Sequence, residues 1–548
     1  MKKNQLALAV LTAATLLAAC DDTKKPAEKN TTDTQAATAA QIETRYKANA
    51  ALANTMYEKM YAHGPNANLF QKYDYRVNEY QQTGGGATAK TTFDMGLNPQ
   101  IYGDKVQPVT LHFTDTITSS PELQGQGIIA RVTHAFDNKD EVKTLIRNFA
   151  AVSGKNDDAA DKAGTGFSTV LDHLRMQTDL LADDNAVATV AISAFQQQDG
   201  DDSIDFKGFN NSIHYNSKTL PDGIYDADFA LEPLTLTMTG KEGGDTSTIS
   251  IAAVKGGWKF TEDGHFSLNI TPIKTETTNA KGMSTFEIAG VDGKGEGVKF
   301  DSAIGTYLGK AEVNINGIRL THNADNVSLG DINIQSDAKK NASGNYDSAA
   351  TFTFKLDGAS LKQALPMLPV EPQNLRIHVG LGELSTAANN ALTEGLQLLN
   401  PQLAAGKDGL MPDGINAETR GKFKTALGEI IKNKTRLSTE ISAQTDAGRA
   451  LLTASVGIRN DSAVPQEEWQ KAIDEAQDSP QHLQNLLKAN LDLDAEFRIS
   501  KPLVDKLGFS KMLEQQGASF VTLEEDEYRS KIESKEGKIT INGNPSPF

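Results

Sequence analysis

Apolar and polar residues alternate with a period of two over the middle of the chain, from about Phe70 to Leu356. The clearest stretches are 234–238, 266–270 and 352–356, in which threonine, serine, asparagine or lysine fill every second position. A strand of this kind has one buried face and one wet face, which is typical of antiparallel sheet. The pattern therefore predicts antiparallel β-structure over this region.

Glycine follows an alternating stretch in three similar places, at 204–209, 286–291 and 313–318. In each place an apolar residue comes directly after the glycine. Glycine at such a position permits a β-bulge or a bend in the sheet. We predict a weak internal repeat with a bulge in each copy, although ordinary β-composition is an equal explanation of the match.

Helical periodicity flanks the predicted strands on both sides. Ile42, Tyr46, Ala50, Ala53 and Tyr57 recur every three or four residues and predict a helix from about residue 41 to 61. Shorter helices are expected at 140–152 and 167–181. After Gly358, further apolar stripes predict helices at 384–399, 423–431, 480–487 and 500–512, with strands near 436–442, 449–458 and 491–499.

Together these elements predict an α+β fold. We expect a large antiparallel, twisted β-sheet region with an N-terminal helix and a helix-rich C-terminal part. The predicted domains are 41–357, a helix plus an antiparallel β-rich domain, and 358–548, an α+β C-terminal domain that ends in a β-hairpin. A chain of 548 residues is long enough for two or three cores.

The first residues have the pattern of a bacterial lipoprotein signal peptide. Two lysines precede an apolar run from Leu6 to Leu17, which is too short to span a hydrocarbon core of about 30 Å. The run ends in Leu17, Ala18, Ala19 and Cys20, which resembles a lipobox. We expect cleavage after Ala19 and lipid attachment at Cys20.

Several expectations follow from a lipidated N-terminus. Cys20 is the one cysteine of the chain, so stability must come from packing without an internal disulfide. Asp21 and Asp22 are typical of lipoproteins kept at the inner membrane. Residues 20–40 are polar and low in complexity, which predicts a disordered tether. We expect a location in the envelope of a Gram-negative bacterium, with the periplasmic face of the inner membrane favoured over the outer membrane.

The net charge of the chain limits the classes of molecule that it is expected to bind. The net charge of −17 argues against nucleic acid and against electrostatic attraction to anionic lipid. Membrane attachment is therefore expected through the N-terminal lipid. An envelope protein or an apolar lipid ligand remains as a partner for the folded part.

The sequence contains no recognisable catalytic motif. There is no zinc signature and no Gly-x-Ser-x-Gly elbow, and the glycines at 293–297 lack the Lys-Ser/Thr of a phosphate loop. We predict no catalytic residues, no metal and no cofactor.

Other residues of chemical interest have simpler interpretations. Trp258 and Trp469 are expected in cores rather than as stacking platforms. His63, His112, His134 and His173 share no spacing that groups them. The aspartates Asp199, Asp201, Asp202 and Asp205 lack the glycine and glutamate of an EF-hand, so they predict a solvated loop.

The C-terminal stretch carries a family resemblance. Gly517, then 528–532 (Tyr-Arg-Ser-Lys-Ile), then 537–543 (Gly-Lys-Ile-Thr-Ile-Asn-Gly) resemble the ending of the YdgA/YihF family of bacterial envelope proteins of unknown function. Members of that family generally keep an uncleaved N-terminal anchor, whereas this chain has a lipobox. The resemblance implies an envelope protein of similar β-then-helix order and supplies no catalytic residues.

Three classes of function remain. The leading hypothesis is a non-catalytic, membrane-anchored scaffold or binding protein, because long one-faced sheets must cover their apolar side or leave it for an acyl chain or a peptide. The second hypothesis is a periplasmic hydrolase with unrecognised motifs. The third is a surface-exposed, adhesin-like lipoprotein.

Overall fold

The structure is a computed structural model. It describes residues 37–62, 64, 67, 69–99, 106–152, 169–199, 202–239, 246–323, 325–404, 416–516, 520–535 and 537–546. Contacts divide the chain into two compact units. Unit 1 comprises residues 1–283, 299–306 and 396–415, and unit 2 comprises residues 284–298, 307–395 and 416–548.

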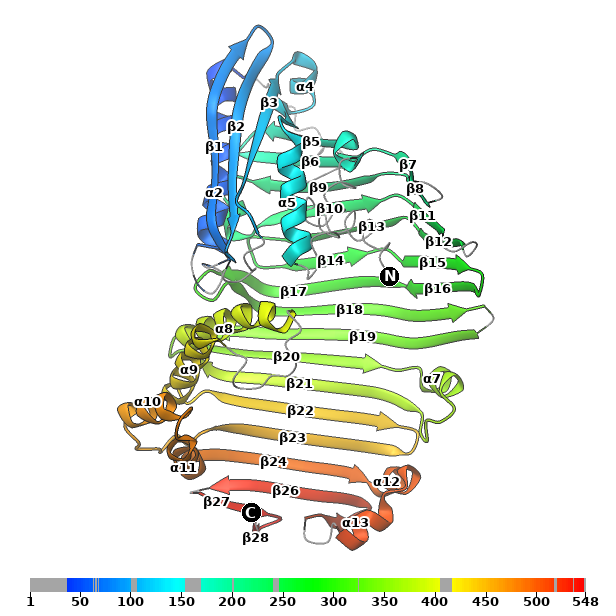
Figure 1. Cartoon of the computed structure of the whole chain (residues 1–548), viewed down its shortest axis with the longest axis vertical. Coiled ribbons are helices and arrows are strands. Elements are labelled where there is room, and N and C mark those ends of the chain that lie inside the picture. Colours follow the sequence, from blue (N-terminus) through cyan, green and yellow to red (C-terminus); the bar gives the residue numbers. More distant parts are fainter. Residues whose placement is uncertain are drawn as a thin grey trace. The chain divides into compact units, whose positions relative to one another are not determined.

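Unit 1 is built on antiparallel strands that each pair with a neighbour in space (Figure 1). One series of pairings runs β1–β2–β3–β4–β5–β6–β9–β10–β13–β14, and a second runs β7–β8–β11–β12–β15. The strands are β1 (Phe70–Thr83), β2 (Gly86–Leu97), β3 (Val109–Thr118), β4 (Ile128–Phe136), β5 (Leu174–Leu181), β6 (Asn185–Ile192), β7 (Phe195–Asp199), β8 (Asp202–Phe206), β9 (Phe209–Asn216), β10 (Tyr225–Leu231), β11 (Leu234–Thr239), β12 (Thr246–Ile251), β13 (Val254–Phe260), β14 (Phe266–Ile270) and β15 (Ile273–Asn279).

The strands of unit 1 break at aligned positions. β8 gives way to β9 at residues 207–208, and β10 gives way to β11 at residues 232–233. Backbone bonds join the two breaks, from Glu232 N to Gly208 O (2.9 Å) and from Lys207 N to Pro233 O (3.1 Å). Gly208 has a φ of +136°, which favours glycine. The predicted bend at this glycine is therefore present, and it recurs in the neighbouring strands.

Helices α2 (Ala39–Met60) and α5 (Lys139–Val152) cover one face of the unit 1 sheet. The short helix α4 (Pro121–Gly125) and the 3-10 turn η2 (Leu220–Asp222) lie in connections between strands. Ile42 and Tyr46 of α2 pack on alanines of β2, β4 and β6, whose small side chains allow a close approach. Val142 of α5 belongs to a second core with Leu111 of β3 and Phe206 of β8. The predicted helices at 41–61 and 140–152 are confirmed.

Helix α2 also covers the outer edge of strand β1. Asn54 accepts a hydrogen bond from the Tyr75 backbone N–H (2.8 Å) and donates one to the Tyr75 carbonyl (2.9 Å). These backbone groups face away from β2, so the amide of Asn54 takes the place of a further strand. An exposed strand edge is a template for aggregation, and this contact blocks it.

Unit 2 is a second antiparallel series. The pairings run β16–β18–β19–β20–β21–β22–β23–β24–β26–β27–β28, and β25 adds to β26. The strands are β16 (Gly282–Ile288), β17 (Gly290–Asp301), β18 (Thr306–His322), β19 (Asp325–Lys340), β20 (Tyr346–Lys355), β21 (Pro372–Leu384), β22 (Arg436–Thr445), β23 (Gly448–Ile458), β24 (Leu491–Ser500), β25 (Thr522–Glu524), β26 (Glu527–Lys535), β27 (Lys538–Ile541) and β28 (Asn544–Pro545). The register of β18 slips between Ile315 and Ile318, at Gly317 with a φ of +60°, as the glycine repeat predicts.

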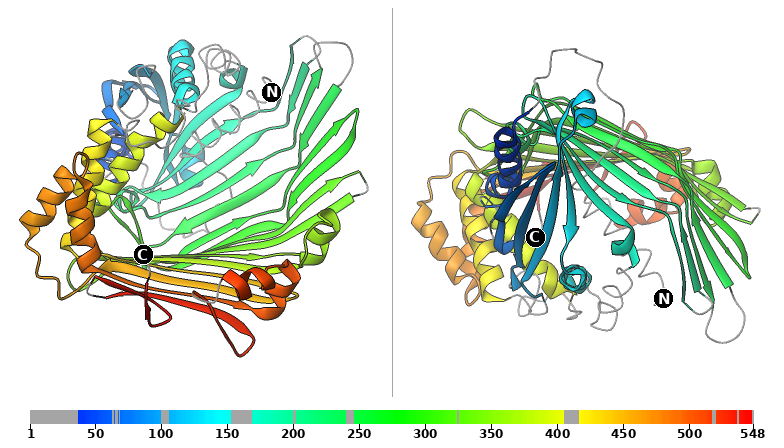
Figure 2. Two further views of the ribbon diagram at one scale, coloured as in Figure 1. Left: turned by 60° about the horizontal axis from the view of Figure 1, so that its bottom comes forward. Right: turned by 90° about the horizontal axis from the view of Figure 1, so that it is seen from above.

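The helices of unit 2 lie at the ends of its strands, as Figures 1 and 2 show. They are α7 (Gly358–Ala364), α9 (Ala417–Lys432), α10 (Gln466–Glu475), α11 (Pro480–Asn490), α12 (Lys501–Leu507) and α13 (Ser510–Gln516). Helix α8 (Thr386–Ala404) follows β21, and its residues are divided between the two units. Ile431, Trp469 and Ile473 form a core with Ile458, the last residue of β23. The helices are thus connections between strands, and they meet the sheet at its margins.

The prediction of a helix-rich C-terminal part is wrong. Long antiparallel strands continue to the end of the chain, and the helices are inserted between them. The helical stripes were recognised correctly, but the long strands between these helices were given too little weight. The predicted helix at 167–181 is also wrong beyond residue 173, because residues 174–181 form β5. Residue 357, the predicted domain boundary, is the N-cap of α7 within unit 2.

Candidate functional site

One face of the unit 2 sheet carries an unbroken row of apolar side chains across neighbouring strands. Residues directly opposite each other in antiparallel strands point to the same face, so the register defines the row. It passes through β18, β19, β20, β21, β22, β23 and β24 as Val313, Ile334, Phe352, Ile377, Ile441, Leu452 and Phe497.

Three parallel rows continue the same face on either side. Their members are apolar, or small residues and hydroxyls, and none is charged. One row is Ile315, Ile332, Phe354, Leu375, Ala443, Ala450, Ile499 and Tyr528; the next is Ala311, Ser336, Ala350, Val379, Thr439, Ala454, Ala495 and Ile532; the last is Gly309, Ala338, Ser348, Leu381, Leu437, Val456, Leu493 and Ser534. We call these four rows the uncovered apolar face.

Several large side chains of this face remain open to water. Phe352 is 36% exposed, Ile441 is 37% exposed and Leu437 is 41% exposed. Val379 and Phe497 are exposed to a similar degree. A sheet face that packed against a helix layer would bury these residues, as unit 1 buries Leu111 and Ile117. In the described part of unit 2 the apolar residues therefore form an accessible surface.

The area of the face is large. Strands lie about 4.8 Å apart and same-face residues about 6.7 Å apart along a strand, so eight strands and four rows cover about 34 by 20 Å. That is about 680 Å² of sheet, compared with roughly 300–600 Å² for the largest apolar patch on an ordinary monomer. Apolar patches of this size mark sites of interaction.

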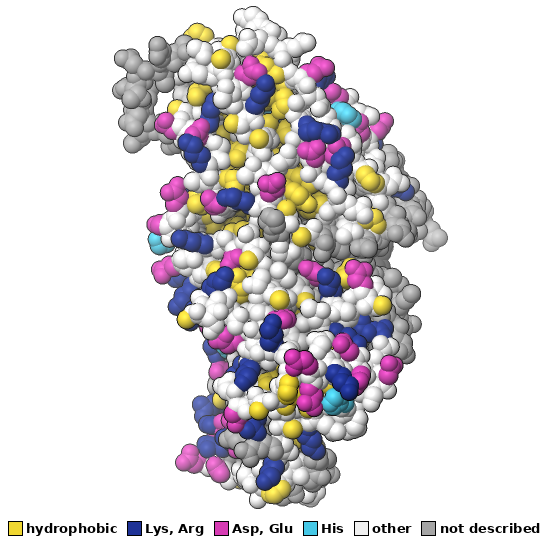
Figure 3. All heavy atoms as spheres, turned by 90° about the vertical axis from the view of Figure 1, so that its left-hand side faces the viewer, with side chains coloured by type: hydrophobic (Ala, Val, Ile, Leu, Met, Phe, Trp, Pro, Cys, Tyr) yellow, Lys and Arg dark blue, Asp and Glu magenta, His cyan; other side chains and the backbone are white. Residues whose placement is uncertain are grey.

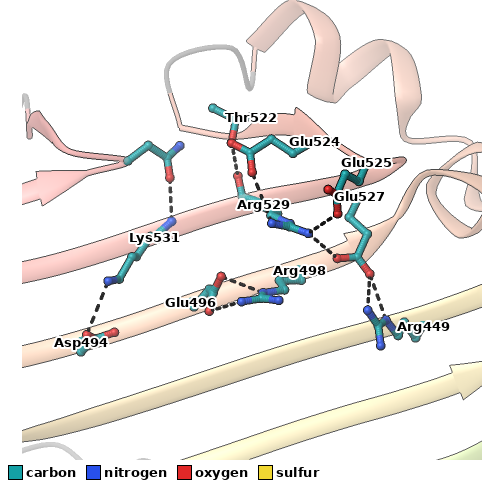
Figure 4. A network of polar contacts seen from close by, with 11 residues as sticks. Arg449, Asp494, Glu496, Arg498, Thr522, Glu524, Glu525, Glu527, Arg529 and Lys531 are labelled. Atoms are coloured by element: carbon teal, nitrogen blue, oxygen red, sulfur yellow. Dashed lines mark hydrogen bonds and ion pairs between the residues drawn. The ribbon is translucent and has the colours of Figure 1, made fainter.

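The opposite face of the same strands is polar. One of its rows is Glu312, Gln335, Thr351, His378, Glu440, Thr453, Glu496 and Lys531. Figure 4 shows this polar face over strands β23 to β26, where Glu527 accepts a hydrogen bond from Arg449 (2.8 Å) and pairs with Arg529 (3.4 Å). The hydrogen bond from Arg449 is the main cause that lowers the pKa of Glu527. Charges on this face neutralise one another, so it is a solvated face.

The molecular surface at the strand ends that carry α8 to α11 shows no field of one sign. Lysine and arginine side chains are interspersed with aspartate and glutamate over the visible side in Figure 3. A nucleic-acid site would need a basic patch or stripe. This surface does not provide one.

Comparison with models of known protein families gives a match over nearly the whole chain. Residues 32–548 match the model of a family described as bacterial protein of unknown function (DUF945). The chain belongs to this family. No curated protein and no solved structure matches the chain. The narrower resemblance to YdgA and YihF stays a prediction.

In this DUF945 member, titratable side chains also converge beneath helix α2. Tyr46 donates to Asp115 (2.6 Å), and His134 contacts Asp115 through Nδ1 (2.8 Å) and Thr178 through Nε2 (3.1 Å). Asp115 is fully buried, and burial raises the pKa of the Tyr46 hydroxyl, with Asp115 adding to the effect. The contacts satisfy a buried carboxylate and fix α2 on the sheet, so the cluster is structural.

The other residues singled out in the sequence lie apart from the apolar face. His112 contacts Glu141 (2.9 Å) and His173 contacts Ser193 (3.2 Å). Trp469 is buried in the core between α9 and α10, as predicted. Asp205 pairs with Lys207, which with Gln196 lowers its pKa. Among the described residues no three His, Cys, Asp or Glu side chains are placed to hold a metal ion.

The predicted N-terminal sites lie outside the described residues. These are the cleavage site at Leu17, Ala18 and Ala19, the lipid site Cys20 and the sorting residues Asp21 and Asp22. His63, Asp201, Gly517 and most of the tether lie outside them too. No described helix is both long enough and apolar enough to span a bilayer.

Sequence analysis recognised the alternation in Phe352 and Phe354 but overlooked strand β21. Its apolar residues Leu375, Ile377, Val379 and Leu381 alternate with asparagine, arginine, histidine and glycine. That alternation was a usable signal. The rows themselves could not be found, because they depend on the register of successive strand pairs, and one row extends from Gly309 to Ser534 in the sequence.

Proposed function

We propose that this protein is a non-catalytic lipid-binding protein of the bacterial cell envelope, and that its uncovered apolar face holds acyl chains. The observation that carries the proposal is the set of four uncharged rows across β18 to β26. Their large members include Phe352, Val379, Leu437, Ile441 and Phe497, each of which is exposed by 36% or more. Burying each methylene of a ligand against such a face is worth about 0.8 kcal/mol.

An acyl chain suits this face better than a peptide does. Backbone groups of interior strands are paired within the ladder, and the face offers hydroxyls at only a few positions such as Ser336 and Thr439. A peptide laid flat on it would leave its own N–H and C=O groups without partners, at a cost of roughly 1–3 kcal/mol for each group. An acyl chain has no such groups.

The dimensions of the uncovered apolar face also agree with the length of an acyl chain. A hydrocarbon core of about 30 Å contains two leaflets, so one acyl chain extends about 15 Å. The face is longer than this in both directions, at about 34 by 20 Å. Protein interfaces are usually enriched in aromatic residues, methionine and arginine at their centre. The four rows contain phenylalanine and tyrosine but no tryptophan, methionine or arginine.

The envelope location rests on the signal sequence and Cys20. We propose that Cys20 becomes the lipidated first residue and that the following polar segment tethers the protein to a membrane. Mass spectrometry of the N-terminal peptide from the native host should give a mass increased by acyl groups. A Cys20→Ser variant should move to the soluble fraction. An unmodified Cys20 would refute the anchor and leave the binding face untouched.

Photo-crosslinking tests the binding face. The probe is palmitate with a diazirine on its chain, and the sites of attachment are mapped by mass spectrometry. Attachment is expected on strands β19 to β24 and should fall at least tenfold in Ile441→Glu, which puts a carboxylate in the central row. The matched control is Ser442→Glu, the adjacent residue on the polar face, where Arg376 lies opposite.

Two results would overturn this proposal. One is attachment spread over the polar face as well as the apolar face. The other is equal labelling of Ile441→Glu and Ser442→Glu, which would mean that the central row does not bind the chain.

A further inference from the structure

Five of the six most exposed apolar side chains of the described residues gather at one end of the unit 2 strands. Those exposed by 49% or more are Leu365, Met367, Leu396, Phe509, Met512 and Leu523. Met367 reaches 87%. All except Leu396 follow α7 or lie in the segment from α12 to β25.

The topology places these segments at the same strand ends. The α7 segment joins the end of β20 to the start of β21, and the segment from α12 to β25 joins the end of β24 to the start of β26. β20 and β24 are separated by three alternating antiparallel strands, so they run in the same direction. Both segments appear on the right of the lower half in Figure 1.

The turn between β22 and β23 ties the two segments together. The Asp446 carboxylate accepts from the backbone N–H of Glu371 (2.8 Å) and pairs with Lys506 of α12 (2.6 Å). The Asp446 N–H also donates to the Glu371 carbonyl (3.1 Å). This end is therefore one connected rim, and its apolar side chains are held in fixed relative positions.

The loop after α7 is suited to a medium without water. Residues 365–370 read Leu-Pro-Met-Leu-Pro-Val and contain no polar side chain. The two prolines have no N–H, and the N–H groups of Leu365 and Leu368 are bonded to Leu361 O (2.8 Å) and Leu365 O (2.9 Å). Few donors would lose water if the loop entered hydrocarbon, which is the main cost of placing a loop there.

We infer that this rim inserts into the surface of a lipid bilayer and brings the uncovered apolar face to the source of its acyl chains. The inference rests on the proposed function and adds where the lipid enters. The row that contains Phe354 and Ile499 is the one nearest this rim. Phe354 is one residue from the end of β20, and Ile499 is one residue from the end of β24. An acyl chain leaving the bilayer would meet the apolar side chains of this row directly behind the rim.

Hydrophobic insertion, rather than charge, accounts for the attraction. Three lysines of the rim are paired with carboxylates: Lys362 with Glu371 (3.3 Å), Lys501 with Asp505 (3.3 Å) and Lys506 with Asp446 (2.6 Å). Lys511 on α13 belongs to none of these pairs, so the rim offers only a weak positive field to anionic headgroups. Binding should therefore be insensitive to salt and to anionic lipid, unlike that of a polybasic surface.

A single-cysteine fluorescence experiment tests this inference. Cys20 is the one native cysteine, so the full chain with Cys20→Ser and Met367→Cys takes one NBD label. Leu396→Cys in the same background is the matched control, because Leu396 is 55% exposed but lies on α8. Any attachment through the N-terminus would bring both labels to the vesicles equally.

The expected result is a blue shift at 367 and not at 396 on adding phosphatidylcholine vesicles, with quenching by doxyl lipid at 367. Phosphatidylglycerol or 0.5 M salt, about five times the ionic strength at which the Debye length is ~10 Å, should not change it. Phe509→Asp, on the second segment, should lower partitioning at least tenfold, and Leu396→Asp should not. Circular dichroism checks that both variants fold.

Several results would overturn the inference. They are no response at 367, an equal response at 396, a response that needs phosphatidylglycerol and disappears in salt, or a response to lipid-free envelope proteins instead of vesicles. Palmitate cross-linking of the same Phe509→Asp chain in detergent separates this inference from the proposed function. If Phe509→Asp keeps its palmitate cross-linking and loses vesicle binding, the result supports the proposed function and the membrane insertion of the rim. If the native chain does not cross-link palmitate, the result refutes the proposed function and does not test insertion of the rim.

Discussion

The openness of the apolar face predicts a particular pattern of folding stability. Ile441 of the central row is 37% exposed, whereas Ile473 in the helical core is 1% exposed. Replacing isoleucine by alanine removes three carbons, worth about 2.4 kcal/mol at ~0.8 kcal/mol for each buried methylene. At Ile473 a cavity term is added, so we expect a loss of about 3.5 kcal/mol in the free energy of unfolding.

At Ile441 the same substitution should cost much less. Roughly two-thirds of the methylene term applies, about 1.5 kcal/mol, and no sealed cavity forms because the removed atoms faced water. The expected difference between Ile441→Ala and Ile473→Ala is therefore about 2 kcal/mol. The comparison is between two isoleucines of the same unit, so the unfolded state changes equally in both.

Urea unfolding followed by tryptophan fluorescence measures this difference. Trp469 is 2% exposed and belongs to the same core as Ile473. In a Trp258→Phe background its emission reports on unit 2 alone, which matters because a chain of two units need not unfold in one step. Equal slopes against urea would show that the midpoints can be compared.

Equal losses of stability at the two positions would refute the reasoning. They would mean that Ile441 is covered in the folded protein, either by a part of the chain outside the described residues or by a second copy. The proposed lipid site would then have no free surface. A loss at Ile441 above about 3 kcal/mol would be sufficient for this conclusion, because it requires a cavity.

Other predictions concern unit 1. Asn54→Leu should expose the edge of β1 and raise light scattering on concentration, whereas Thr55→Ala, one residue along α2, should not. Tyr46→Phe should cost about 1–3 kcal/mol in urea unfolding, because the buried Asp115 loses a donor. Hydrogen bonds from Lys72 and Thr110 lower the pKa of Asp94 below 3.8. Its stabilising contribution is therefore complete above pH 3.8 and is lost as pH falls through the lowered pKa, so Asp94→Asn should flatten the acid limb of stability against pH.

Local patterns were sufficient to predict many individual elements. The apolar stripe from Ile42 to Tyr57 gave α2, and the strands predicted at 436–442, 449–458 and 491–499 correspond to β22, β23 and β24. Ser479 and Pro480 marked the start of α11, although the Ser479 side chain makes no capping bond. These signals are local because helix periodicity and strand alternation depend on neighbours a few residues apart.

The arrangement of the elements was not accessible in the same way. Whether Ile441 is buried depends on where α8 to α11 lie, and nothing in their own stripes states that they pack at strand ends. The apolar residues of α9, α10 and α11 meet each other and Ile458 instead of the sheet face. Likewise, Tyr46 and Asp115 come together across 69 residues of sequence. Such contacts are set by tertiary packing, which a periodicity does not contain.

The aligned strand breaks have a consequence for how this protein can change. Ile204 and Phe206 occupy even positions, whereas Phe209 and Ile213 after the break occupy odd ones, and Leu231 and Leu234 differ in the same way. Each break thus resets the phase of alternation, and its neighbours reset at the same level. Deleting one residue from one break would move every side chain in the following half of that strand to the opposite face of the sheet, while the neighbouring strands kept their faces. We therefore expect insertions and deletions at this line to be tolerated only in pairs of residues, and loss of the bend to require coordinated change in every strand that crosses it.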